Sequence, residues 1–251
     1  AWQKIDVKVY LAFFLILSTG FSASFFATKF QHSATDVGWI SIFVSTMGVF
    51  YAVLVGFFVV HVWGKYNSIR AEISRDVNSL RNVYLLTRQL SSKRLSAEFA
   101  RRLAVYIDEV VNTFWASPTK AELNTKFSKL FECFERVKLK MRWDPIFLDK
   151  IIEELRISSF SQASLLNLAK EKTPKILWVL LIFLSVTLVF SFIFIGFQDQ
   201  FLATLLITLI SAAVSLVLTL IYDMDQPFRG GFWRISPEPY LQLQEFVKKS
   251  R

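Results

Sequence analysis

The fold of this chain is decided by the stretch WISIFVSTMGVFYAVLVGFFVVHVW, residues 39–63, which contains no Asp, Glu, Lys or Arg. Three further apolar runs, at 9–28, 176–197 and 201–222, are equally free of these charged residues. About 20 apolar residues cross the hydrocarbon core of a bilayer, and lipid offers the backbone no hydrogen-bond partners. The sequence therefore predicts an all-α membrane protein with four transmembrane helices in two pairs.

The composition favours the same fold class. The chain has 251 residues, of which 53% are hydrophobic and 26 are Phe, and its mean hydropathy is +0.42. The alternative is a large soluble helical protein, but core helices seldom stay free of charge over 20 residues. The first run has membrane length and continues through Phe25 and Phe26, so we expect it to be retained rather than cleaved as a signal peptide.

The basic residues predict the orientation. The linker between the two pairs holds 21 of the 29 Lys and Arg, the C-terminal tail holds five, and the two short connections hold only Lys29. By the positive-inside rule, both termini and the linker 64–175 are cytoplasmic. We expect a bacterial inner membrane protein, with import into an organelle left open. The predicted divisions are 1–63, first transmembrane pair; 64–175, cytoplasmic helical bundle; 176–222, second transmembrane pair; and 223–251, cytoplasmic tail.

The linker has the periodicity of helices. The second span is predicted to continue past Trp63 as one long helix. The stretch that follows Gly64 is not interrupted by Gly or Pro, and apolar residues recur in it at steps of three and four. A second helix is expected from Arg94 to Trp115. A third follows with the apolar face Phe127, Leu130, Phe131, Phe134, Val137 and Met141. Asp144 is expected to cap the N-terminus of a fourth helix.

The chemistry of the side chains argues against catalysis. Cys133 is the only cysteine, and His32 and His61 are the only histidines, which is too few for a clustered metal site. Phosphate-binding loops and nucleophile elbows are absent from the sequence. We therefore expect no enzyme activity, no cofactor and no metal. The net charge of +9 fits a basic face beside anionic lipid, and a nucleic-acid partner is not expected.

Small residues follow one face of the second span at helical spacing. They are Ser41, Ser45, Gly48, Ala52 and Gly56. Close helix packing is the commoner cause of such a face, and the lining of a pore is the alternative. Both hold at once if several copies surround an axis. The adjacent Val49, Val53 and Phe57 then face inward as a narrow apolar ring.

The second span resembles the second transmembrane helix of bestrophin channels. The resemblance lies in Val53-Leu54-Val55-Gly56-Phe57, followed by Val59, Val62-Trp63, Tyr66 and Arg70. The order of two spans, a helical block, two spans and a tail is also similar. The chain resembles most the bestrophin-like domain family of unknown function, found in bacterial and plant membrane proteins.

This resemblance implies a pentameric channel whose hydrophobic neck is formed by Val49, Val53 and Phe57. After the last span, Asp225-Gln226-Pro227-Phe228 is similar to an acidic Pro-Phe segment of the family. Where animal bestrophins continue with acidic residues that clasp calcium, this chain has Arg229-Gly230-Gly231-Phe232. Hard cations need several oxygen ligands, so we predict no calcium clasp.

An apolar neck does not choose the sign of the ion, so selectivity requires charged rings at its ends. The candidates near the cytoplasmic mouth are His61, Lys65, Tyr66 and Arg70. A basic vestibule favours anions, whereas residues at this depth also snorkel to lipid headgroups. We predict an oligomeric, anion-conducting channel whose partners are membrane lipid, inorganic ions and further copies of the chain. The alternative is a non-conducting, membrane-anchored helical scaffold or regulatory subunit.

Overall fold

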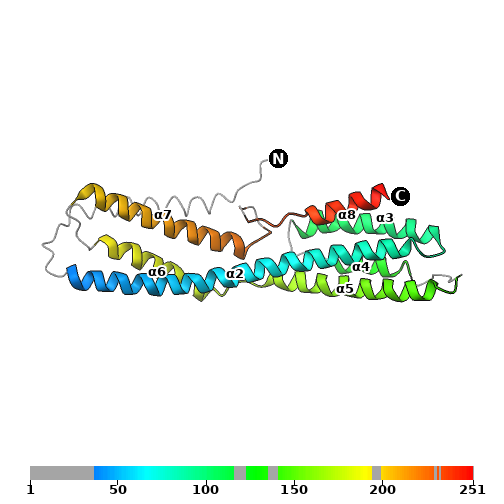
Figure 1. The fold of residues 1–251 in the computed structure, drawn as a ribbon, viewed down its shortest axis with the longest axis horizontal. Coiled ribbons are helices and arrows are strands. Elements are labelled where there is room, and N and C mark those ends of the chain that lie inside the picture. The colour runs from blue at the N-terminus through cyan, green and yellow to red at the C-terminus, as the bar shows by residue number, and fades with distance from the viewer. Residues whose placement is uncertain are drawn as a thin grey trace. The chain divides into compact units, whose positions relative to one another are not determined.

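The computed structural model describes residues 37–115, 123–134, 141–193, 199–228, 231 and 233–250. Every regular element within these residues is helical, which confirms the predicted all-α class. The elements, labelled as in Figure 1, are α2 (Val37–Thr87), α3 (Lys93–Glu109), the π-helical turn η1 (Val110–Phe114), α4 (Leu123–Phe131), α5 (Asp144–Lys170), α6 (Lys175–Ile193), α7 (Gln200–Asp225) and α8 (Glu238–Lys249).

The chain divides into two compact units. The span unit comprises the chain up to Gly64 together with Lys172–Arg234. The bundle unit comprises Lys65–Glu171 together with the segment from Ile235 onward. Helices α6 and α7 thus belong to the span unit, α3, α4, α5 and α8 belong to the bundle unit, and α2 contributes to both.

Helix α2 is a single helix of 51 residues, which confirms that the second span continues beyond Trp63. At 1.5 Å per residue it is about 75 Å long, whereas the hydrocarbon core of a bilayer is about 30 Å thick. Only part of α2 therefore lies in lipid. The part without acidic or basic residues, 39–63, is the segment suited to that environment.

Three helices of the described residues are long and apolar enough to cross a membrane. They are Gly38–Thr87, Lys175–Phe192 and Phe201–Asp225. Two of the predicted spans, 39–63 and 201–222, lie wholly within these helices, and the predicted span 176–197 is helical as far as residue 193, where the described residues of α6 end. The first predicted span, 9–28, lies outside the described residues, so the four-span topology stays a prediction.

In the span unit, α2 packs through a narrow stripe that repeats every seven residues. Val44, Tyr51 and Phe58 are buried along this stripe. The hydroxyl of Ser185 on α6 donates to Tyr51 Oη at 3.2 Å. The ring of Phe58 meets Trp178 edge-on, with centroids 6.2 Å apart. The stripe therefore faces α6 with aromatic and hydroxyl contacts.

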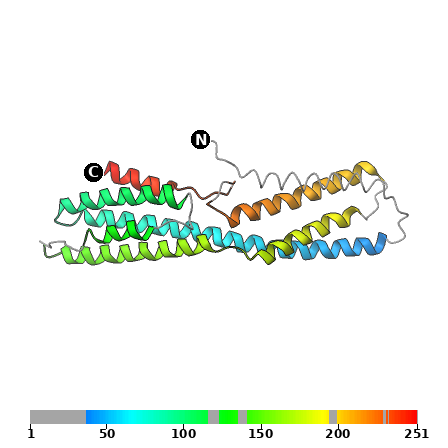
Figure 2. The same ribbon diagram turned by 180° about the vertical axis from the view of Figure 1, so that it is seen from behind.

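In the bundle unit, the apolar stripes predicted from the linker form the core. On α2, Tyr66, Ile69, Ile73, Leu80 and Tyr84 are buried, and on α3 the buried residues are Leu95, Phe99, Leu103, Tyr106 and Ile107. Figures 1 and 2 show α8 running beside α3 in both views, and these helices are in contact. The side chains of Tyr240, Leu243 and Val247 are buried, so α8 covers this core.

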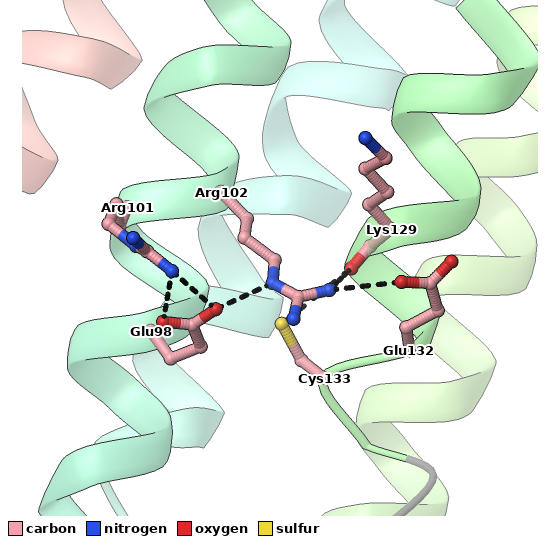
Figure 3. A network of polar contacts seen from close by, with 6 residues as sticks. All are labelled: Glu98, Arg101, Arg102, Lys129, Glu132 and Cys133. Carbon is pink, nitrogen blue, oxygen red and sulfur yellow. Dashed lines mark hydrogen bonds and ion pairs between the residues drawn. The ribbon is translucent and has the colours of Figure 1, made fainter.

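Helices α3 and α4 are tied together by the guanidinium of Arg102, which Figure 3 shows between two carboxylates. Its Nε donates to Glu98 Oε1 at 2.7 Å. Its Nη1 donates to the Lys129 carbonyl at 2.6 Å and to Glu132 Oε2 at 3.3 Å. Partial burial raises the pKa of the neighbouring Cys133 thiol, so this cysteine stays protonated near neutral pH.

Two details of the predicted bundle are wrong. Helix α4 ends at Phe131 rather than continuing to Met141, whose side chain is 48% exposed instead of part of the apolar face. Asp144 is the first residue of α5 and not its cap. Its buried carboxylate instead accepts hydrogen bonds from Ser91 Oγ at 2.7 Å and from the backbone N–H of Met141 at 3.0 Å. It joins the α5 start to a loop far away in sequence, which spacing does not reveal.

Candidate functional site

The candidate site is the side of α2 that the other described residues leave open. Between Ser41 and His61, only Val44, Tyr51 and Phe58 are buried. A helix turns about 100° per residue, so Val53, two positions after Tyr51, is rotated by about 200° and its direction differs from that of the packed stripe by about 160°. The open side is therefore opposite to the contacts with α6.

The three predicted neck residues lie on this open side. Val49 is 67% exposed, Val53 is 54% exposed and Phe57 is 72% exposed. Successive members are four residues apart, so each lies about 6 Å further along the helix axis and the set covers about 12 Å. The protomer thus presents a continuous apolar strip. Their assignment to a pore neck stays a prediction, since one protomer does not define an axis.

The small-residue face is also largely uncovered by the described residues. Ser41, Ser45, Ala52 and Gly56 are exposed, and Gly48 is half-buried. A Cβ atom added to Gly48 would lie 4.0 Å from Leu188 Cδ1, whereas one added to Gly56 would have no atom within 4 Å. Packing against the protomer's own α6 therefore involves Gly48 and leaves most of this face available.

The four predicted mouth residues differ in burial. His61 and Arg70 are exposed, whereas Lys65 and Tyr66 are each 8% exposed. In the bundle unit, Lys65 Nζ donates to the Glu171 carbonyl at 2.7 Å. The guanidinium carbon of Arg70 lies 5.8 Å from the centre of the Tyr66 ring. His61 and Arg70 are thus the mouth candidates whose side chains reach the surface of the protomer.

The acidic end of α7 has structural partners. Asp225 Oδ1 accepts a hydrogen bond from Thr173 Oγ1 at 2.7 Å. A Cβ atom on Gly231 would lie 2.7 Å from the Asp223 carboxylate, so glycine permits the backbone to approach it. Within the described residues, His, Cys, Asp and Glu form no group of three suited to a metal ion. Arg229, Gly230 and Phe232 lie outside the described residues. The absence of a calcium clasp therefore stays a prediction.

A buried polar cluster in the bundle unit, centred on Asp76 of α2, was not predicted from the sequence. Asp76 is fully buried and accepts hydrogen bonds from the Ser158 hydroxyl of α5 and from Tyr240 Oη of α8, the latter at 2.6 Å. A carboxylate within an apolar stripe, between Ile73 and Leu80, is the sequence signal that could have identified it.

Burial raises the pKa of Asp76 to about 6, and the charge of Glu72 acts in the same direction. The hydroxyls of Ser158 and Tyr240 and the amide of Gln162 oppose this change. The Gln162 Nε2 acts here as a nearby dipole, because it has no hydrogen-bond partner of normal geometry among the described residues. The same holds for Tyr106 Oη, so this region contains more polar atoms than the contacts of the described residues satisfy.

Long apolar helices accompanied by a helical bundle define an all-helical integral membrane protein. The sequence matches the Bestrophin-like domain over residues 11–240, so the chain belongs to the Bestrophin-like family. This match confirms the resemblance inferred from the second span. None of the curated proteins matches the chain in sequence.

Solved structures of bacterial relatives share the fold. A bestrophin homologue from Klebsiella pneumoniae is similar with a TM-score of 0.78 and 12% identity, covering 94% of this chain and 97% of that chain. A point mutant of the homologue from the same organism has a TM-score of 0.81 and 11% identity, covering 96% and 97%. At such low identity the likeness establishes the fold and not the site residues.

Proposed function

We propose that this chain is the subunit of an oligomeric ion channel in which several α2 helices surround a central axis. The observation that supports this most is the open side of α2, where Val49, Val53 and Phe57 are exposed opposite the packed stripe. Membership of the Bestrophin-like family and the shared fold add support at the level of the family. The small residues beside these three permit neighbouring helices to approach closely.

Val49, Val53 and Phe57 are proposed to form the neck of the pore. Around an axis, each residue becomes a ring, and the three rings together line about 12 Å of the path. A narrow apolar constriction passes ions only when water fills it. The width of the neck is therefore proposed to control conduction. Phe57 has the largest side chain of the three, and the extent to which its ring reaches into the path is proposed to set that width.

The proposed ion is an anion. Arg70 is exposed, carries a permanent positive charge, and is repeated in every subunit of a ring. His61 adds a second exposed group that is able to carry positive charge. The ammonium group of Lys65 is held inside the subunit by the Glu171 carbonyl and contributes to the field without lining the surface. Positive rings at a pore mouth raise the local concentration of anions.

The proposed assembly has five copies, as the resemblance to bestrophins implies. Each subunit crosses the bacterial inner membrane four times, with both termini and the 64–175 linker in the cytoplasm. The distribution of Lys and Arg supports this orientation. Lipid covers the outward sides of α6 and α7, where Ile182, Phe183 and Leu209 are at least half exposed.

Native mass spectrometry and planar-bilayer recording of the purified chain test this function. We expect a complex with the mass of several subunits. Its current is expected to change severalfold in Phe57→Ala, because removing the aromatic side chain widens the neck. Phe183→Ala is the matched control, since Phe183 is 62% exposed on α6 and outside the proposed pore. A monomeric particle would overturn the channel and leave a membrane-anchored helical scaffold.

The sign of the ion is tested by the reversal potential in a KCl gradient. The wild-type complex is expected to reverse near the chloride equilibrium potential, and Arg70→Glu is expected to move this value toward that of potassium. A complex that conducts but is selective for cations would refute the anion assignment and leave the pore intact.

A further inference from the structure

The C-terminal helix α8 is held to the bundle by a small number of identifiable contacts. The indole Nε1 of Trp115 donates to the Ile235 carbonyl at 2.9 Å, at the entry to α8. The ring of Phe246 meets Tyr84 edge-on at 6.2 Å, near the end of α8. Between these contacts lies the hydrogen bond from Tyr240 Oη to Asp76 Oδ2. A buried carboxylate thus lies at the centre of the docking surface.

We propose that Asp76 and Tyr240 form a proton-controlled latch, which holds α8 more tightly when Asp76 is protonated and more loosely when it is ionised.

Among the described residues, the surroundings of Asp76 supply hydroxyl and amide partners, and the one charged group that affects its pKa is negative. On its own helix the charged neighbour is Glu72, whose negative charge opposes ionisation. Helix α5 contributes Ser158 and Gln162, which are uncharged. Helices α3 and α8 contribute Tyr106 and Tyr240, in both of which burial raises the pKa well above its usual value. The ionised carboxylate is therefore buried beside uncharged donors and without a cation among the described residues, which is costly.

The neutral acid fits the same cluster without that cost. The carbonyl oxygen of protonated Asp76 still accepts from Tyr240, and the new O–H requires an acceptor. Ser158 Oγ is already within hydrogen-bond distance of Asp76 Oδ1, and both residues are fully buried. When the Ser158 O–H turns away, the lone pairs of this oxygen provide an acceptor for the proton. Both protonation states are thus compatible with the docked helix, but only the ionised state gains from the entry of water.

Release of α8 relieves the ionised state. When Tyr240 leaves, water reaches Asp76 and its pKa returns toward the ordinary value of 3.8, from about 6 in the docked state. The docked form therefore binds the proton more tightly, and the docking equilibrium falls as pH rises between these two values. The fall is at most tenfold per pH unit and about a hundredfold in total, and docking is constant above this window.

Hydrogen–deuterium exchange of the full chain in detergent tests the latch. We expect the protection of α8 amides, corrected for intrinsic exchange rates, to fall at least tenfold from pH 4.5 to pH 6.5 and then to level off. Amides of α7, in the span unit, are the internal control. In Asp76→Asn the protection of α8 is expected to be independent of pH. A wild-type profile without this fall, or the same fall in Asp76→Asn, would overturn the proposal.

Tyr240→Phe keeps the test decisive if the Asn variant does not fold. The Tyr240 hydroxyl lowers the pKa of Asp76 by donating to its ionised form, so its removal is expected to move the level part of the profile to a higher pH. A purely structural role for Tyr240 would reduce protection equally at every pH. This uniform loss would refute the latch, and the channel proposal would be unaffected.

Discussion

Replacing Gly56 by leucine distinguishes a packing or pore face from a lipid-facing surface. A Cβ atom at Gly56 meets no atom of the described residues within 4 Å, so this part of the subunit has room for the new side chain. Glycine in a helix interior is about 1 kcal/mol less favourable than a good helix former. For an isolated protomer, Gly56→Leu is therefore expected to be neutral or slightly stabilising.

The expectation reverses if copies of α2 meet along this face. The added isobutyl group then enters a close helix–helix contact, and overpacking of this kind costs about 1 to 3 kcal/mol per subunit. A cyclic assembly repeats this cost at each interface. We expect the solubilised Gly56→Leu complex to dissociate into smaller particles, although its helical content is unchanged.

Size-exclusion chromatography with light scattering measures the outcome. Ala213→Leu is the control, because Ala213 is an exposed small residue on α7 and receives a side chain of the same size. If Gly56→Leu forms complexes of wild-type mass with wild-type conductance, the small-residue face lies against lipid and the proposed arrangement of α2 is refuted.

Three further predictions concern the bundle. Leu103→Ala, at a fully buried position, is expected to lower the free energy of unfolding by about 3 kcal/mol in hydrogen exchange; a loss below about 1 kcal/mol would contradict the packed core. Trp115→Phe leaves the Ile235 carbonyl without its donor and is expected to lower the free energy of unfolding by about 1 to 3 kcal/mol. In hydrogen exchange, the α8 amides are expected to lose protection first, and an equal loss throughout the bundle would contradict this. Asp76 binds its proton more tightly in the folded than in the unfolded state, so its stabilising contribution is complete below pH 3.8 and is lost as pH rises to about 6. We expect urea titrations to show that the free energy of unfolding falls by about 3 kcal/mol across this range. This fall is expected to be absent in Asp76→Asn.

Much of the fold could be predicted because its signals are local. The continuous α2 follows from an apolar stripe that no Gly or Pro interrupts after Gly64, and the buried face of α3 follows from residues spaced by three and four. The helices within the predicted third and fourth spans follow from the same absence of charge. In each case the deciding information lies within one turn or two of the helix.

The features that sequence analysis missed depend on distant partners. Helix α8 is short and begins among prolines, and its burial depends on Trp115 and Asp76, more than 100 residues earlier. The charge of Lys65 predicts exposure, although Lys65 lies seven residues after Phe58, in register with the packed stripe; the Glu171 carbonyl, 106 residues away, accepts a hydrogen bond from its ammonium group inside the bundle unit. The neck strip could be selected from spacing, whereas its relation to an axis depends on other copies of the chain.

Accessibility of a cysteine at Val53 tests the central claim most directly. In a Cys133→Ser background, Val53→Cys carries the only thiol of the chain. We expect a membrane-impermeant thiol reagent, added during planar-bilayer recording, to block most of the current within minutes, while Phe183→Cys in the same background is unaffected. A Val53→Cys channel whose current and thiol remain unmodified would mean that this side of α2 faces lipid tails, which contradicts the proposed pore.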